Sequence, residues 1–534
     1  MKYLEGKDRH QVEIYSRSLD ETVGADNEVR LIDAFVRNLS MSELGFRTDY
    51  IENGRPAYRP GDLLKLYIYG YLNRIRSSRT LERECMRNIE VIWLMKGLVP
   101  DHNTISNFRR DNPKAIRKVF QATVQVAKNF NLIGGKLLAG DSTKLRAQNS
   151  KKNNFNPKKI EQHLEYIDKK LEEYSHVLAT EDQDKIPAEE RVEIEKKIRK
   201  HKIQRQKYES MQQQLEESGD TQISTSDPES RQMITRNNIT EVAYNVQTTV
   251  DSDHNIPIDY KVTNENDSKA MGGMVRRTKT ILGSSDFTTL YDKGYHTGSE
   301  FAYADKQGVE VIVAVPNVAS HAPDIRFDVE HFNYDKATDS YTCPANETLK
   351  TNDRWYSKHY GKTINKIKQY KTSACKTCEL QSQCTSNKNG RMIERSEHAD
   401  LISANKQRHD SQPATYRRRQ AIVEHPYGTI KRQWGFSYII TKRSMKHATA
   451  DVGLIFTAYN LRRILNIIGI EAFRSWLLAF FIVIGPILKS IAQFWRRQKK
   501  QHQNMIQNFT ALISTKIGTL ASPYFNNWVL KEGY

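Results

Sequence analysis

KLLAGDSTKL, residues 136–145, decides the fold, because the pattern of the chain changes there from helical to strand-like. The stretch is a short apolar run that ends at Asp141, as expected for a buried strand with an acid at its carboxyl end. A second stretch of the same form, DFTTLYDKGY (286–295), ends its apolar run at Asp292. The two acids therefore predict neighbouring buried strands that bring two carboxylates to one edge of a sheet.

The segments around these two stretches alternate in a defined order. Helices are expected within 264–282 and near 298–306, and further strands at EVAYNVQTTV (241–250), IPIDYKV (256–262) and VEVIVAVP (309–316). The order is a three-strand meander, a helix, a strand, a helix and a strand. This is the order of a ribonuclease H-like fold, so we predict an α/β catalytic domain over residues 134–470.

The first 133 residues are expected to be all-helical. Apolar residues between Leu64 and Ile75 recur on one helix face, and PDHNTISNFRR (100–110) supplies a chain break followed by helix-capping residues. Short helices joined by tight turns and carrying Arg109 and Arg110 favour a DNA-binding domain of the helix-turn-helix kind. A helical bundle with solvated arginines fits the same residues equally well.

Residues 150–222 differ in composition from the strands on either side. The apolar seam of a coiled coil, with spacings of four and three, is formed by Ile160, Leu164, Ile167, Leu171, Tyr174 and Leu178. A second, charged helix is expected from about Pro187, so the segment predicts an antiparallel helical hairpin inserted into the catalytic domain. Its role stays open between a solvated spacer and a DNA-facing arm or dimer contact.

Four of the five cysteines lie in the polar segment 317–400, which we expect to be irregular and to lack a core of its own. Cys375 and Cys378 make one C-x-x-C knuckle, with Cys343 before it and Cys384 after it. Four thiolates suit a closed tetrahedral zinc site, and reduced thiols without a ligand are the alternative. Cys85, in the helical region, is expected to be a small core residue.

Charge and cysteine content limit the class of protein. The chain has 534 residues and a formal net charge of +19, which favours a polyanionic partner such as nucleic acid. Five cysteines exclude a disulfide scaffold, and the first residues include no apolar run that would act as a secretion signal. The apolar run from Trp476 to Leu488 has 13 residues, too few to span a bilayer, so we expect no membrane partner. Residues 471–534 are expected to form a helical, basic tail.

A third acid comes from the strongly basic segment 405–447, in which Glu424 is one of only two acids. Two carboxylates held together repel each other, and a divalent cation removes that repulsion. Glu424 is therefore the expected third metal ligand beside Asp141 and Asp292, with an internal salt bridge as the alternative. Lys431 lies seven residues later, so in a helix it shares a face with Glu424 and is placed to contact a phosphate.

Several of these stretches resemble the DDE transposases of bacterial insertion sequences, and within them the subgroup with a tyrosine-arginine-glutamate-lysine signature. The catalytic part of the resemblance is carried by GDSTKLRAQNSKKNN (140–154), LYDKGYHTGSEF (290–301) and VEHPYGTIKRQWG (423–435). YRPGDLLKLYIYGYLNRIRSSRTLE (58–82) is similar to the N-terminal domain of that subgroup. The resemblance spans roughly residues 30–470.

The signature implies roles for residues near the glutamate. Lys431 occupies the lysine position. The subgroup has its tyrosine and arginine seven and four residues before the glutamate, where this chain has Arg417 and Gln420. Tyr416 and Arg419 each lie one residue further away and are the candidates for the corresponding DNA contacts. Relatives also carry a cysteine-bearing insertion before the glutamate, which favours zinc as the ligand of the four thiols.

The resemblance implies an enzyme that binds the ends of its own element, cleaves DNA and joins the freed ends to target DNA. Its catalytic metal, Mg²⁺ or Mn²⁺, would be held by Asp141, Asp292 and Glu424. We expect double-stranded DNA as the partner, a homodimer on DNA, and a place in the bacterial cytoplasm with the nucleoid. A catalytically silent DNA-binding protein derived from a transposase and a metal-dependent nuclease without strand transfer are the alternatives.

Overall fold

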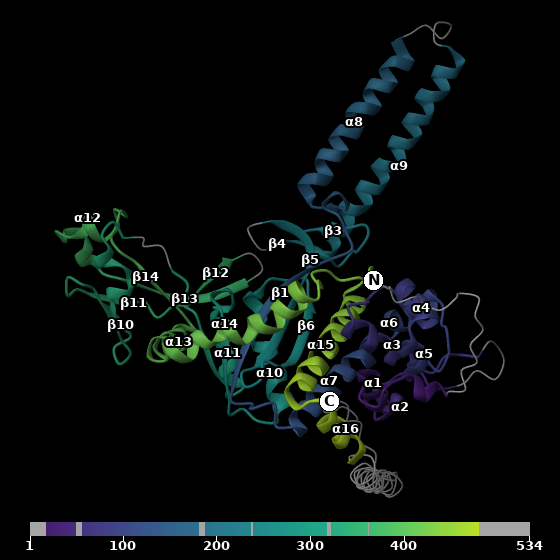
Figure 1. Ribbon diagram of the computed structural model, residues 1–534. Coiled ribbons are helices and arrows are strands. Elements are labelled where there is room, and N and C mark those ends of the chain that lie inside the picture. The colour runs from purple at the N-terminus through teal and green to yellow at the C-terminus, as the bar shows by residue number, and fades with distance from the viewer. Residues whose placement is uncertain are drawn as a thin grey trace, which may run out of the picture.

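The central element of the computed structural model is a mixed sheet, and the model describes residues 18–49, 56–180, 187–235, 239–317, 322–360 and 363–479 (Figure 1). Its six strands are β1 (Leu137–Arg146), β4 (Arg231–Ile234), β5 (Thr240–Asp251), β6 (Pro257–Thr263), β7 (Thr288–Tyr291) and β8 (Glu310–Val313). β5 pairs with β4, β6 and β1 in antiparallel fashion, whereas β1, β7 and β8 run parallel to one another. With α10 (Met271–Leu282) and α11 (Gly298–Lys306), this confirms the predicted order of meander, helix, strand, helix and strand.

Asp141 lies in the middle of the ten-residue strand β1, not at its carboxyl end as the sequence predicted. The strand continues because β5 pairs with it from Leu138 to Arg146, while the parallel partner β7 pairs only as far as Ala139. Asp141 therefore lies just beyond the point where β7 separates from β1. Asp292 directly follows β7, so both acids still belong to the carboxyl edge of the parallel strands.

Helices cover both faces of the central sheet. On one face lies α14 (Pro413–Gly428), whose Ile422 and Val423 pack on Ala139 and Leu290. On the other face lie α10 and α15 (Met445–Ile468), which contact β6. Burial of apolar side chains on both faces makes this a three-layer arrangement, in which the acids are the polar edge of an otherwise apolar sheet.

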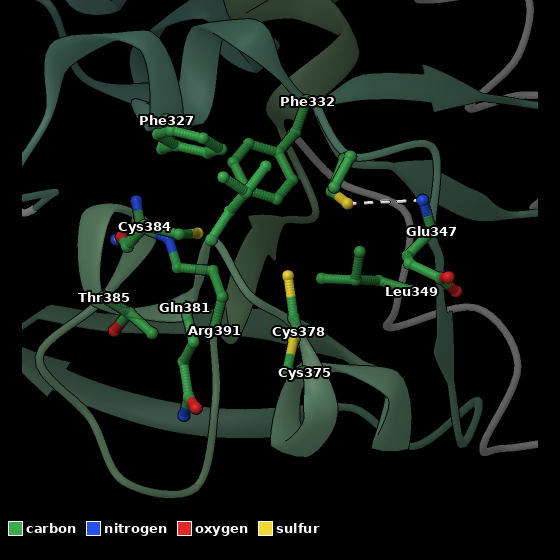
Figure 2. A pocket seen from close by; sticks show the side chains of 13 residues that line it. Phe327, Phe332, Glu347, Leu349, Cys375, Cys378, Gln381, Cys384, Thr385 and Arg391 are labelled. Atoms are coloured by element: carbon green, nitrogen blue, oxygen red, sulfur yellow. Dashed lines mark hydrogen bonds between the residues drawn. The ribbon is translucent and has the colours of Figure 1, made fainter.

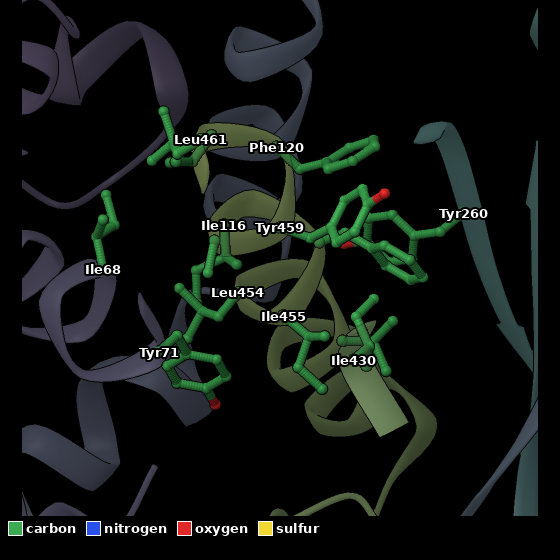
Figure 3. Close-up of a cluster of buried hydrophobic side chains, with 14 of the residues drawn as sticks. Ile68, Tyr71, Ile116, Phe120, Tyr260, Ile430, Leu454, Ile455, Tyr459 and Leu461 are labelled. Carbon is green, nitrogen blue, oxygen red and sulfur yellow. The ribbon is translucent and has the colours of Figure 1, made fainter. Parts of the chain in front are cut away.

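The N-terminal region is helical, as predicted, but its core is continuous with that of the sheet. Ile68 and Tyr71 from α3, and Ile116 and Phe120 from α7, surround Leu454 of α15 (Figure 3). The expected boundary near residue 133 is thus a change of secondary structure and not a gap in the core. The helices are α1 (Glu28–Arg37), α2 (Met41–Leu44), α3 (Pro60–Leu72), α4 (Ser78–Arg87), α5 (Ile89–Met95), α6 (His102–Asp111) and α7 (Pro113–Asn129). Cys85 is buried in this core, as predicted.

The predicted helical hairpin is confirmed, and in Figure 1 it projects away from the rest of the molecule. It consists of α8 (Pro157–Thr180) and α9 (Ala188–Ser218), joined at the base by the short strands β2 (Asn154–Phe155) and β3 (Ile223–Ser224). Ile160 and Ile167 of the predicted seam are buried, whereas Leu171, Tyr174 and Leu178 nearer the tip are half-exposed. The seam is therefore closed mainly at its base.

The cysteine-bearing segment forms a second antiparallel sheet, so the expectation of an irregular segment without a core is wrong. Alternate apolar residues, Tyr341, Leu349, Tyr370 and Ile393, meet Phe332 in a small core that polar neighbours conceal in the sequence. The strands are β9 (Asn333–Asp335), β10 (Ser340–Thr342), β11 (Thr348–Thr351), β12 (Tyr356–Tyr360), β13 (Thr363–Lys371) and β14 (Ile393–Ser396). Beside them lie α12 (Gln381–Cys384) and α13 (Ala399–Ser411).

The described part of the chain ends with α16 (Ile470–Ala479), whose Phe473 is buried beside α1 and α15. Most of the predicted basic tail, residues 480–534, lies outside the described residues. Among the described residues, no helix combines the length and the apolar character that crossing a lipid bilayer requires.

Candidate active site

Asp141 is the most constrained acid at the carboxyl edge of the parallel strands. Its Oδ1 accepts a hydrogen bond from the backbone N–H of Ser142 at 2.7 Å, and its Oδ2 accepts one from Arg419 Nη1 at 3.1 Å. Its side chain is 21% exposed, so the carboxylate is largely withdrawn from water but still accessible. This combination of burial and access is what a reactive carboxylate needs.

Asp292 lies close enough to Asp141 to affect its charge. Burial raises the pKa of Asp141 to about 6, Arg419 opposes the rise, and the charges of Asp292 and Asp267 add to it. Asp292 itself caps a short 3-10 turn, where its Oδ1 accepts from the N–H of Gly294 at 2.8 Å. The two predicted acids are thus near enough to repel each other, and a bound cation would relieve that repulsion.

Helix α14 supplies the side chains that close the site from above the sheet. Tyr416 donates from its hydroxyl to the carbonyl of Tyr291 at 3.1 Å, and Arg419 forms the ion pair with Asp141. Tyr416 and Arg419 are three residues apart on one helix face, which packs against the strands through Val423. Tyr416 and Arg419, each one residue away from its signature position, therefore lie on the side of α14 that faces the two aspartates.

Glu424 is not brought together with the two aspartates. It is exposed, and its Oε1 accepts from Gln420 Nε2 at 2.9 Å, one helical turn earlier. Within the described ranges, no three or more acids, histidines or cysteines form a group that could hold a metal ion. Asp141 and Asp292 fit a divalent cation as a pair of carboxylates, whereas the position of Glu424 does not complete the set.

Lys431 contacts strand β1 directly. It lies in a π-helical turn (Thr429–Gln433) that continues α14, and Pro426 is accommodated inside α14 without ending it. The Lys431 ammonium donates to Thr143 Oγ1 at 3.0 Å and to the carbonyl of Lys144 at 3.1 Å. The regular helix that the spacing assumed is thus replaced by a wider turn, of a kind that is frequent at functional sites.

Asp267 is a nearby acid that the sequence did not single out. Its Oδ1 accepts from Asn245 Nδ2 and Gln247 Nε2, each at 2.7 Å, and Lys144 Nζ lies 3.2 Å from its Oδ2. Burial alone would raise the pKa of Asp267, but Lys144 and these hydrogen bonds lower it. A methyl group placed on Gly294 would lie 3.0 Å from Asp292 Oδ1 and 3.8 Å from Asp267 Oδ2, so the two acids flank one glycine. In the sequence, only the position of Asp267 between β6 and α10 could have indicated this residue.

Arg109 is buried, and this corrects its predicted role as a DNA contact. Its side chain is 6% exposed, donates from Nη1 to the hydroxyl of Tyr71 at 2.9 Å, and lies 3.7 Å from Asp451. Arg110 is half-exposed and pairs with Asp111 at 2.6 Å. Neighbouring arginines on a helix point in different directions, so one lies in the core and the other faces solvent.

The four cysteines of the second sheet line one small cavity of about 30 Å³, which is closed on one side by Phe327 and Phe332 (Figure 2). Burial raises the pKa of Cys384, with the charges of the other three cysteines adding to the rise and Arg391 opposing it. Such a cavity has room for about one water-sized sphere. Four thiols around a space of that size fit the donor set of a zinc ion, although their present spacing does not form a ligand group.

Comparisons with known families agree with two parts of this architecture. Residues 17–111 match the family model described as Transposase domain (DUF772), which covers the N-terminal helices. Residues 342–465 match the model described as Transposase DDE domain, which covers strands β11 to β14 of the cysteine sheet, α14 and most of α15. Together the two matches support a DDE transposase of the insertion-sequence type. A comparison with curated proteins gives no match.

Proposed function

We propose that the protein binds the ends of its own insertion sequence and catalyses metal-dependent cleavage and strand transfer, on a ribonuclease H-like catalytic domain. The observation that carries the proposal is the meeting of Asp141 and Asp292 at the carboxyl edge of parallel strands. The match of residues 342–465 to a transposase DDE domain supports it. The net charge of +19 suits a DNA partner.

In this proposal, Asp141 and Asp292 would hold a divalent cation, Mg²⁺ or Mn²⁺. When bound, the cation supplies activation of the attacking oxygen and stabilisation of the leaving oxygen of a phosphodiester. Arg419 pairs with Asp141 in the present structure and would instead pair with a DNA phosphate when the cation is bound. Tyr416 and Lys431 hold α14 and its π-helical turn against the strands that carry the acids.

Glu424 is our proposed third carboxylate, as the resemblance implies. It is exposed and apart from the two aspartates in this structure, so it would have to approach them when the cation binds. Asp267 is its competitor within the structure. Glu424→Gln should weaken Mn²⁺ binding to the protein, measured by titration calorimetry without DNA, while Asp267→Asn should leave it within about threefold of wild type. Weakened binding in Asp267→Asn alone would transfer the third position to Asp267.

The cysteine cavity is proposed as a structural zinc site. Binding would draw the four thiolates of Cys343, Cys375, Cys378 and Cys384 into one tetrahedral set. Purified protein should then contain about one zinc per chain, and Cys378→Ser should lose it. Cys85→Ala is the matched control and should retain the metal, because Cys85 is buried in α4 and does not line the cavity. Wild-type protein free of zinc would leave these residues as reduced thiols.

An assay with labelled element ends and Mg²⁺ tests the function as a whole. Joined products support transposition, cut products alone indicate a nuclease, and binding without cutting indicates a DNA-binding protein derived from a transposase. A dimer on DNA is expected to appear as a complex of two chains with two ends.

A further inference from the structure

A cavity of about 350 Å³ lies between the N-terminal helices and the helices around the active site. Neither Asp141 nor Asp292 lines it, and the function proposed above does not use it. Three arginines from two separate parts of the chain line it: Arg74 after α3, and Arg462 and Arg463 on α15. Three cations around one cavity favour a compensating anion, and the described residues that line the cavity include no acid.

Only one of these three arginines is paired with an acid. Arg462 pairs with Glu28 at 3.0 Å, which accounts for one charge. Arg463 donates from Nε to the carbonyl of His254 at 2.8 Å, a neutral partner. Arg74 is exposed, and its guanidinium has no hydrogen-bond partner among the described residues. Two positive charges therefore remain available to an anion.

The remaining wall of the cavity is partly aromatic. Tyr459 is 2% exposed, lies 2.7 Å from His425 Nδ1 through its hydroxyl, and donates to the carbonyl of Asn255 at 3.0 Å. Trp434 packs beside Tyr459 with ring centroids 6.3 Å apart. Arg74 is held at φ 63°, in the left-handed region that costs a non-glycine residue about 1 kcal/mol. A strained arginine at the mouth of a cavity is a feature that functional sites retain.

The cavity adjoins the active site through α14 and its π-helical turn. His425 lines the cavity and directly follows Glu424. Thr429 and Gln433 line it from the same turn in which Lys431 contacts the catalytic strand β1. The cavity and the site of the two acids thus share the same helix and the turn that continues it.

We propose that this cavity binds a backbone phosphate of the DNA next to the cleavage site, through Arg74 and Arg463. The inference rests on the proposed function for the identity of the DNA, but the site itself depends only on the cavity. Arginine suits the ligand because its planar group donates two hydrogen bonds to one phosphate.

Arg74→Gly separates the binding role from a structural one. Glycine removes the charge and also relaxes the left-handed backbone, so the melting temperature should stay equal or rise. The salt slope of binding to element ends should fall by about one unit, the loss of one phosphate contact. Arg74→Lys should restore most of the slope. Arg47→Gly, at an exposed arginine outside the cavity, is the control and should leave the slope unchanged.

The outcomes distinguish the inference from the proposed function. If wild type cleaves DNA and the salt slope of DNA binding is unchanged in both Arg74→Gly and Arg463→Ala, the cavity does not bind a DNA phosphate. The proposed transposase function is then unaffected. If the two variants reduce the salt slope of DNA binding but wild type does not cleave DNA, the phosphate site is supported and the proposed transposase function is wrong. Competition by inorganic phosphate at millimolar concentration, with an unchanged DNA slope in the variants, would make the cavity a small-anion site and overturn the DNA assignment.

Discussion

Two aspartates paired with arginine, Asp451 and Asp141, lie in contrasting surroundings. Asp451 on α15 is fully buried and accepts from Arg76 Nη2 at 2.5 Å, from the hydroxyl of Tyr71 and from the N–H of Ile440 at 2.8 Å. Asp141 is partly exposed and meets a single arginine, Arg419. Both are acid–arginine pairs, but only the first is surrounded by donors.

The number of donors decides how each acid behaves. Burial alone would raise the pKa of Asp451, but two arginines, Tyr71 and a backbone N–H lower it, so its charge is fully compensated. At Asp141, burial raises the pKa to about 6 and one arginine does not reverse the rise. The compensated Asp451 joins the N-terminal helices to α15, whereas the carboxylate of Asp141 would be stabilised further by another cation.

Asp451→Ala should cause the largest loss of stability among these variants. It leaves Arg76 and Arg109 buried without their acid, so the free energy of unfolding should fall by about 3–5 kcal/mol. Urea denaturation followed by circular dichroism measures the change. Asp111→Ala, at an exposed acid paired with Arg110, should change the same quantity by less than about 0.5 kcal/mol. A loss below about 1 kcal/mol in Asp451→Ala would show that the buried cluster does not hold the two regions together.

Asp141→Asn should have the opposite profile, with a large loss of activity and little change in stability. Cleavage of element ends should fall at least about 100-fold, equivalent to about 2.7 kcal/mol in the activation barrier. The free energy of unfolding should change by less than about 1 kcal/mol, because burial already disfavours the charged form of the Asp141 carboxyl. DNA binding should persist.

The control for that variant is Asp253→Asn, because Asp253 is exposed in a turn. Asp251 does not serve, since it is buried and accepts from the N–H groups of Gly134 and Gly135 at 3.2 and 2.8 Å. Retained cleavage in Asp141→Asn would remove the acid from the proposed site.

Arg109→Ala and Arg110→Ala sharpen the comparison on a single helix. Arg109→Ala should lower the free energy of unfolding by about 1–3 kcal/mol through lost bonds to Tyr71 and the Asp451 cluster. Arg110→Ala should stay within about 0.5 kcal/mol, because exposed ion pairs contribute little. Equal destabilisation by the two variants would contradict the burial of Arg109.

Asp339, on the second sheet, is an intermediate case with the smallest expected effect. Burial opposes the shift, but hydrogen bonds from Lys368, Tyr370 and Tyr334 lower its pKa to about 2. Since the folded pKa lies below the ordinary 3.8, its stabilisation is present above pH 3.8 and is lost as the pH falls toward 2. Asp339→Asn should cost about 1 kcal/mol at pH 7, and its difference from wild type should vanish near pH 2 in thermal melts. A pH-independent difference would mean that the charge of Asp339 is not what stabilises the sheet.

Sequence patterns predicted the elements better than the environments of single side chains. The order of strands and the place of Asp292 after β7 follow from apolar runs, and the hairpin follows from its apolar seam, because both patterns report burial directly. The apolar run before Asp141 did not show that β1 continues past this residue, because the continuation depends on pairing with the distant strand β5. The burial of Arg109 could not be predicted, because its partner Asp451 lies more than 300 residues away along the chain. The spacing of Glu424 and Lys431 could not reveal the π-helical turn, because such a turn depends on packing against β1. The second sheet was missed because its apolar residues alternate with many polar ones.

The short pairing of β2 with β3 has a consequence for how quickly the chain reaches its native state. The central strands β1 and β5 are separated in sequence by the whole hairpin, and closing so long a loop carries a large entropic cost. Local helix formation in α8 and α9 brings Asn154 and Ser224 side by side, which shortens the effective loop before the sheet assembles. The hairpin thus converts a distant encounter between two strands into a nearly local one, and a version of the chain that kept its length but lost these helices would be expected to fold more slowly.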